Sequence, residues 1–126
     1  MATIAFVKAT RPLPDPIVGN GVIHTFTWSA LGQGDDGGPV EINGNVVDFV
    51  VQATGAFSGA ATIAFEGSND GLNWGSLADG AGAAVSVGSD ALAGVAVIPA
   101  QVRPIVSGGD VSTDIDVVLA VRTAAI

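Results

Sequence analysis

Cysteine and tyrosine are absent from this 126-residue chain, histidine occurs once, and four residues in all are Lys or Arg. Without cysteine, the chain can form neither a disulfide nor a thiolate site. Since His24 is the single histidine, one chain cannot build a zinc site from several histidines. Twelve Asp and Glu residues against the four basic ones give a formal net charge of −8. This balance argues against binding to nucleic acid phosphates and against docking on an anionic membrane surface.

Long hydrophobic runs are also missing. No apolar stretch approaches the roughly eighteen residues of a membrane-spanning helix, and residues 1–8 lack the pattern of a secretory signal. We therefore expect the chain to be made and folded in a cytoplasm. Charged residues are 13% of the sequence, about half the usual share of roughly 25%. With 48% hydrophobic residues, ordinary disorder is excluded, and a surface so poor in charge predicts partners that cover part of it.

What the chain does have is a set of short apolar runs separated by its 18 glycines and six prolines. The clearest run is residues 46–54, where Val47, Phe49 and Val51 fall at every second position and would share one face of a strand. Further strands are expected at residues 2–7, 21–29, 60–67, 72–77, 83–87, 95–98, 102–106 and 114–122. The spacing of two and the abundance of β-branched residues predict an all-β fold, an antiparallel β-sandwich or jelly-roll-like domain of seven to nine short strands.

Proline occupies every second position in the segment Arg11-Pro12-Leu13-Pro14-Asp15-Pro16. Each proline fixes φ and removes a backbone donor, so this segment is expected to be extended, polyproline-like and poor at pairing. We therefore divide the chain into an extended arm with a short strand, residues 1–20, and a sandwich domain, residues 21–126. The arm either lies across its own domain or reaches a neighbouring subunit, where a preset shape limits the entropy lost on docking. In the second case, Arg11, Pro12, Leu13, Pro14 and Pro16 contact the partner.

Asp35 and Asp36 lie in the glycine-rich segment 31–39, which reads as the most flexible loop. Paired carboxylates could act as the acid and nucleophile of a glycosidase or hold a cation. Such chemistry requires a cleft that raises one carboxyl pKa, whereas a loop between glycines offers solvation. We therefore expect Asp35 and Asp36 to belong to a solvated contact loop.

Three other groups of residues have both a chemical and a structural interpretation. Residues 68–73 (Ser-Asn-Asp-Gly-Leu-Asn) carry oxygen ligands as in a calcium loop, but lack the closing glutamate, and a hairpin turn explains them. His24 with Ser29 or Asp48 lacks the Gly-x-Ser-x-Gly elbow of a nucleophilic site, so a structural histidine is favoured. Trp28 and Trp74 could stack on sugars, but core packing is favoured in so aromatic-poor a chain. No catalytic, metal or cofactor-binding residue is predicted.

The stretch from Phe57 to Trp74 (FSGAATIAFEGSNDGLNW) resembles a segment of small tailed-bacteriophage virion proteins, and residues 102–110 and 114–122 fit the same resemblance. The resemblance implies a non-enzymatic structural protein of the virion, a capsid decoration or cement protein. Such a protein binds the major capsid protein on the outer head lattice, often as a homotrimer, without a cofactor. Residues 1–20 and 31–39 would then make the lattice contacts, around a core of residues 46–67 and 114–122.

Other functions remain open at this point. A receptor- or carbohydrate-binding module of a phage tail or secreted protein would use Trp74. A small hydrolase would use Asp35 or Asp36, and we rank it last. A minor capsid or tail-tube component cannot be separated from a decoration protein by sequence.

Overall fold

The computed structural model describes residues 2–15, 19–42 and 46–123, with the backbone alone for residues 13–15, 19 and 20. Within these residues the secondary structure is twelve strands and one 3₁₀ turn, Ser58–Ala60. The strands are β1 (Thr3–Ile4), β2 (Val7–Asp15), β3 (Gly19–Leu31), β4 (Asp36–Gly37), β5 (Val40–Glu41), β6 (Val46–Ala56), β7 (Thr62–Ser68), β8 (Gly75–Ser76), β9 (Ser86–Val87), β10 (Ala91–Gly94), β11 (Gln101–Ser107) and β12 (Asp114–Thr123). Seven of them have four or more residues, within the predicted range of seven to nine.

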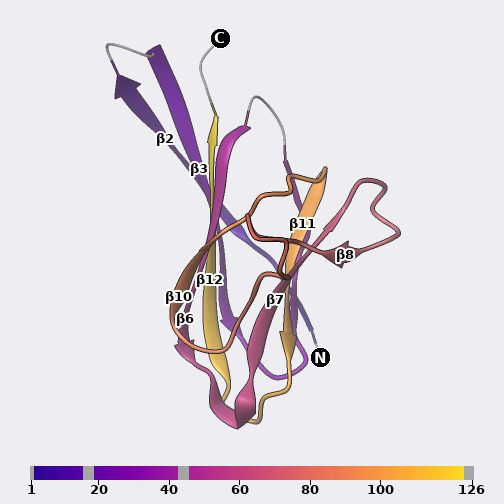
Figure 1. Ribbon diagram of the computed structural model, residues 1–126. Helices are drawn as coiled ribbons and strands as arrows, with labels where there is room; N and C mark the ends of the chain where they lie inside the picture. Colours follow the sequence, from indigo (N-terminus) through magenta and orange to yellow (C-terminus); the bar gives the residue numbers. More distant parts are fainter. Residues whose placement is uncertain (1, 16–18, 43–45, 124–126) are drawn as a thin grey trace.

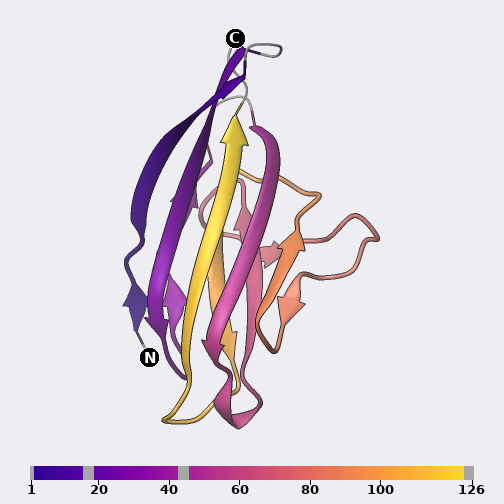
Figure 2. The same cartoon turned by 90° about the vertical axis from the view of Figure 1, so that its left-hand side faces the viewer.

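These strands form two sheets that face each other (Figures 1 and 2). The five-stranded sheet has the order β10-β6-β12-β3-β2, with every pair antiparallel. The seven-stranded sheet has the order β1-β4-β11-β7-β8, with β5 also paired to β11 and β9 to β7. Within it β1 runs parallel to β4, and its other pairs are antiparallel. The predicted all-β sandwich is confirmed. No helix of the described residues is long and apolar enough to cross a membrane.

The core lies between the two sheets and follows the period of two. In β12 the buried residues are Ile115, Val117, Leu119 and Val121, at every second position. Phe49, Val51 and Ala53 of β6 are buried from the same side of the sheet, and Ile63 and Phe65 of β7 approach from the other sheet. Side chains alternate across a strand, so one face of each strand enters the core. The predicted core segments 46–67 and 114–122 are confirmed.

The N-terminal residues are extended as predicted, but they form part of the sandwich rather than a separate arm. β1 lies at the edge of the seven-stranded sheet and β2 at the edge of the five-stranded sheet, paired with β3 over its whole length. Between them, Phe6 packs edge-on against Phe26 and Trp28, with ring centroids 5.5 and 6.1 Å apart. The prediction that the proline segment pairs poorly is wrong, because an edge strand has one side without a neighbour, where missing N–H groups cost nothing.

The chain crosses between the sheets where a strand was predicted. Residues 95–98 are not a strand, because the chain leaves β10 of the five-stranded sheet there and enters β11 of the seven-stranded sheet. The Val95 N–H donates to the Phe49 carbonyl at 3.1 Å, and the Ala96 N–H to the Ala78 carbonyl at 2.9 Å. The strands expected at 72–77 and 83–87 shrink to β8 and β9 for a related reason, since Asp70 and Asp79 close local turns beside them.

Candidate functional site

The five-stranded sheet turns its outer face toward the viewer in Figure 2, and strand register places two rows of uncharged residues on that face. Strand register places these residues side by side across all five strands, on the side opposite the core. We call this surface the flat face. Its rows are Leu92, Gln52, Val118, Thr27 and Val7, and then Gly94, Val50, Ala120, Thr25 and Ala9.

A sheet face exposed to water usually carries polar residues that alternate with the buried ones. On the flat face, Val7 is 72% exposed and Leu92 is 69% exposed, and Val50 and Val118 are only partly covered. None of the ten residues is charged, in a chain whose net charge is −8. The aliphatic and threonine side chains therefore form a continuous, low-charge surface with no sheet packed against it in the described chain.

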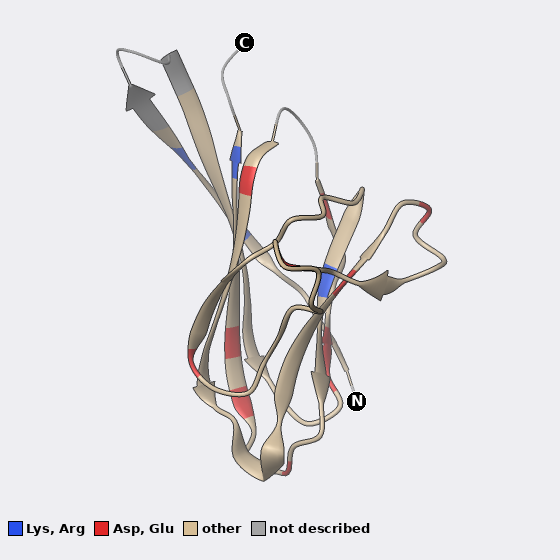
Figure 3. Ribbon diagram, in the orientation of Figure 1, with Lys and Arg blue, Asp and Glu red and all other residues tan. Residues whose placement is uncertain are grey.

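Charged residues border the flat face at its two ends, an Arg–Asp ion pair with a further arginine at one end and two aspartates at the other (Figure 3). At one end Arg122 pairs with Asp48, donating Nε to Oδ1 at 2.8 Å and a second bond to Oδ2. This hydrogen bond and the charge of Asp48 raise the pKa of Arg122, and Arg11 lies in the same row beyond Ile23. At the other end β12 carries Asp114 and Asp116, both exposed.

The seven-stranded sheet has a different outer face. Arg103 of β11 lies opposite Glu66 of β7, and its Nη2 donates to the Glu66 Oε1 at 2.9 Å. The same guanidinium covers the Trp74 ring at 4.0 Å from its centroid.

The prediction of core packing is confirmed for Trp28, which is fully buried and donates Nε1 to the Gly38 carbonyl at 3.0 Å. It is wrong for Trp74, which is partly exposed because the turn before it carries the side chain outside the sheet.

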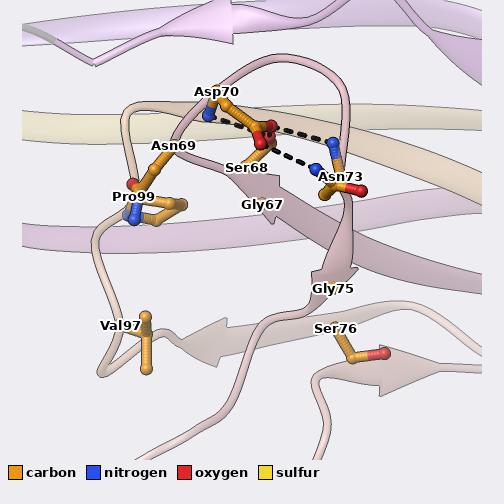
Figure 4. A pocket seen from close by; sticks show the side chains of 9 residues that line it. All are labelled: Gly67, Ser68, Asn69, Asp70, Asn73, Gly75, Ser76, Val97 and Pro99. Atoms are coloured by element: carbon orange, nitrogen blue, oxygen red, sulfur yellow. Dashed lines mark hydrogen bonds between the residues drawn. The ribbon is translucent and has the colours of Figure 1, made fainter.

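The Ser68–Asn73 turn is held by its own hydrogen bonds (Figure 4). Asp70 Oδ1 accepts from the backbone N–H groups of Leu72 and Asn73 at 2.8 Å, and Oδ2 accepts from Asn73 Nδ2 at 2.8 Å. The bonds from Asn73, with those from Leu72 and Ser68, hold the pKa of Asp70 well below its usual range. A shallow hollow of about 380 Å³ opens beside the turn, lined by residues 67–70, 73, 75, 76, 97 and 99. The predicted turn is confirmed, and its oxygens serve the turn itself.

A second hollow, of about 650 Å³, lies at the edge of the five-stranded sheet beyond the end of β10. Its lining is mainly apolar and includes Val47, 64% exposed, and Ile98, 43% exposed. The lining also includes two carboxylates, Asp48 and Asp79, so the hollow is not a continuation of the uncharged flat face.

Asp35 and Asp36 do not form a free loop. Asp35 accepts from the backbone N–H of Ala2 at 2.9 Å and from that of Gly32 at 2.8 Å. Asp36, in β4, accepts from the Thr3 hydroxyl at 3.0 Å. The predicted solvated loop is therefore corrected, because both carboxylates fasten the N-terminal strand to the seven-stranded sheet.

The remaining predicted contact residues lie elsewhere. Arg11 and Pro12 are exposed and lie in β2, which pairs with β3 in the five-stranded sheet, whereas β1 and β4 pair in the seven-stranded sheet. Leu13 and Pro14 belong to the same strand, with their side chains not described, and Pro16 lies outside the described residues. The structure thus separates the proline segment from Asp35 and Asp36, and nothing in it tests their contact with a partner.

The proposed His24 site is not assembled. His24 Nδ1 lies 2.9 Å from the Thr10 hydroxyl and links β2 to β3 on the core side of the sheet. Asp48 points to the opposite side, where Arg122 binds it. Ser29 lies on the strand position that faces away from His24 as well. His24 is therefore structural, as favoured by the sequence.

Sequence reasoning missed both the flat face and the Glu66–Arg103–Trp74 cluster. A signal for the flat face was present, because residues 117–121 (Val-Val-Leu-Ala-Val) are apolar at consecutive positions, which in an antiparallel sheet makes both faces apolar. The cluster had no local signal, since its three residues come together only through the pairing of β7 with β11.

Comparison with known proteins gives no family for this chain. No protein-family model matches it, and no curated protein matches it. Among solved structures, a cysteine peptidase from Thevetia peruviana latex, Peruvianin-I, is 13% identical with a TM-score of 0.42, and the match covers 93% of this chain and 61% of the peptidase.

Two carbohydrate-binding modules are also similar. They are CsCBM6-3 from Clostridium stercorarium in complex with cellobiose and CBM6cm-2 from Cellvibrio mixtus lichenase 5A in complex with cellotriose. Each is 14% identical with a TM-score of 0.31 over 98% of this chain, covering 98% and 99% of the two modules. Likeness at this level carries no argument about function, so the functional argument rests on the chain's own surfaces.

Proposed function

We propose that this chain is a non-catalytic structural protein of a virion that joins its assembly through the flat face. The observation that carries the proposal is the pair of uncharged rows across all five strands of a solvent-facing sheet. An acidic chain that keeps charge off its broadest surface reserves that surface for contact with protein. The resemblance of residues 57–74 to small phage virion proteins supports the finer proposal that the assembly is a phage head and that this chain is a capsid decoration protein on its lattice.

A non-catalytic role has separate support. Asp35 and Asp36, the carboxylates with the strongest chemical interpretation, are bound to the backbone and side chain of the chain's own N-terminal residues. A glycosidase pair needs carboxyl groups free to reach a substrate. Negative net charge also keeps free copies apart before assembly.

The test is to locate the protein in purified particles of the phage that encodes it. Wild-type protein should be present at many copies per particle, and Val118→Lys should be nearly absent, because a lysine in the centre of the flat face leaves a buried charge at the interface. Ala64→Lys places the same charge on the outer face of the seven-stranded sheet and should incorporate normally. Particles that lack the wild-type protein would refute the proposal.

A second candidate function is carbohydrate binding on the seven-stranded sheet. The observation that favours it is a partly exposed tryptophan, Trp74, next to a carboxylate and a guanidinium, Glu66 and Arg103. Sugars stack on exposed indole rings and hydrogen-bond to such groups. A glycan array probed with wild-type protein and with Trp74→Ala decides it, since a glycan bound by the first and not by the second would establish this function.

A further inference from the structure

We infer that the surface bound by the flat face belongs to a different protein and carries a cluster of Lys or Arg residues beside an apolar centre. The inference rests on the proposed function in taking the flat face as the contact surface, and it goes further by giving the chemistry of the partner. In the proposed assembly this partner is the protein of the head lattice. The basis of the inference is the position of the charges around the flat face.

The flat face is acidic at the end where β12 begins (Figure 3). Asp114 and Asp116 are exposed and alternate with buried residues, so both side chains lie on the outer side of the sheet, about 7 Å apart along the strand. Asp90, just before β10, is exposed at the same end, where its Oδ1 accepts from the Gly55 N–H at 3.0 Å. Three carboxylates therefore lie beside the two uncharged rows.

Contacts within the chain do not neutralise these three carboxylates. The ion pairs of the described residues are Arg103–Glu66 and Arg122–Asp48, and neither includes one of the three. Asp116 Oδ1 accepts from the Ala30 N–H at 2.9 Å, but a hydrogen bond from a neutral amide leaves the negative charge in place. Since like charges this close repel one another, a surface with Lys or Arg residues at this end is electrostatically complementary to the flat face.

A second copy of the chain lacks the cations for this contact. Two of its four basic residues are in the ion pairs with Glu66 and Asp48. Lys8 lies over the Phe26 ring at 5.6 Å from its centroid, which leaves Arg11 without an ion pair among the described residues. One arginine does not match three carboxylates, and two chains that are both strongly acidic repel each other. The partner is therefore a different protein.

The uncharged rows and the acidic end make different contributions to binding. The rows span all five strands, whereas the acidic end is formed mainly by β6, β12 and β3, because β10 pairs with β6 only over residues 50–53 and β2 pairs with β3 only as far as Thr27. Apolar area at the centre of an interface supplies most of the affinity. Charges at its rim set the orientation and the association rate. The acidic end thus fixes which way the flat face lies on its partner.

The test is a competition between wild-type chain and a variant, supplied in equal amounts during infection and counted in purified particles by mass spectrometry. Asp114→Lys should be incorporated at least about 10-fold less than wild type, because it sets a positive charge against the cations of the partner. Asp114→Asn removes one attractive pair and should be reduced about 2- to 5-fold. Asp114→Glu keeps the charge and should retain most of the incorporation.

Glu41→Lys is the matched control, because it makes the same change of charge at an exposed residue of β5, in the other sheet. It should be incorporated as wild type is. Melting curves identify any variant that is unfolded. If Asp114→Lys does not fold, the comparison of Asp114→Asn with Asp114→Glu still separates charge from shape.

The outcomes separate the inference from the proposed function. Incorporation of Asp114→Lys at the level of Glu41→Lys would overturn the inference, while the proposed function, tested by Val118→Lys, would stand. Equal loss of Asp114→Glu and Asp114→Asn would also overturn it, because shape rather than charge would then decide binding. A wild-type dimer in sedimentation velocity that Asp114→Lys disrupts would identify the occupant as a second copy. Absence of the wild-type chain from particles would refute the proposed function and the inference with it.

Discussion

The two outer faces of this sandwich belong to sheets that share one core, yet they have opposite characters. The flat face is broad, regular and uncharged, and its five strands are continuous and antiparallel. The outer face of the seven-stranded sheet is interrupted by two-residue strands and carries the Glu66–Arg103–Trp74 cluster. A regular face of long strands can match another flat surface, whereas an irregular face with turns and a charge cluster suits a small ligand or solvent.

The largest expected effect is on the free energy of unfolding and comes from a substitution at Gly37, a buried residue of β4. A Cβ added at Gly37 would stand 2.5 Å from Pro104 and 2.6 Å from Trp28 Nε1. Gly37→Ala should therefore lower the free energy of unfolding by about 3 kcal/mol, measured by urea denaturation. Gly94→Ala is the control, because nothing lies within 4 Å of its Cβ position on the flat face. Equal stability of the two variants would mean that β4 does not pack on Trp28 as described.

The next effect is expected from Phe6, which joins the edges of the two sheets. Phe6→Ala removes a partly buried ring that contacts Phe26 and Trp28, so a loss of about 2 kcal/mol is expected in the same measurement. Deleting residues 1–16 should cost more, since it removes an edge strand from each sheet. A deletion that left stability unchanged would restore the idea of a separate arm.

A smaller effect is expected on the irregular face. Trp74→Ala removes the cation–π contact with Arg103 and should lower stability by about 1 kcal/mol. It should leave incorporation into particles unchanged, because Trp74 does not lie on the five-stranded sheet. Loss of Trp74→Ala from purified particles would show that the two faces are not independent.

The smallest effect concerns the Ser68–Asn73 turn and appears only with pH. The pKa of Asp70 is lowered in the folded chain, so its contribution to stability is present above its unfolded value of about 3.9 and is lost as pH falls through the lower folded value. Melting temperatures of wild type and Asp70→Asn should differ at pH 7 and converge in strong acid. Asp90→Asn is compared with Asp70→Asn, because it changes a carboxylate at a different turn, where Asp90 accepts from the Gly55 N–H. A difference in melting temperature between wild type and Asp70→Asn that grew toward low pH would contradict the lowered pKa of Asp70.

The sequence predicted the core strands of the fold well, but it did not predict which residues form the candidate contact surface. Both predicted core strands, residues 46–54 and 114–122, match β6 and β12 because each has one fully apolar face. The contact residues assigned to the proline segment and to Asp35 and Asp36 were selected for local chemistry, and local chemistry did not reveal that both are bound within the chain's own sheets.

The sequence by itself determined that this protein is built of strands, which side of the main strands enters the core, and where the Asn69-Asp70-Gly71 turn lies. A period of two and turn-forming residues are properties of neighbours in the chain, so they can be read locally. Only the tertiary structure decided that β1 and β2 complete the edges of both sheets, that Trp74 lies outside the core, and that uncharged residues from five strands align into one surface. These depend on which strands pair and which sheet covers which face, and those choices are made by residues far apart in the sequence.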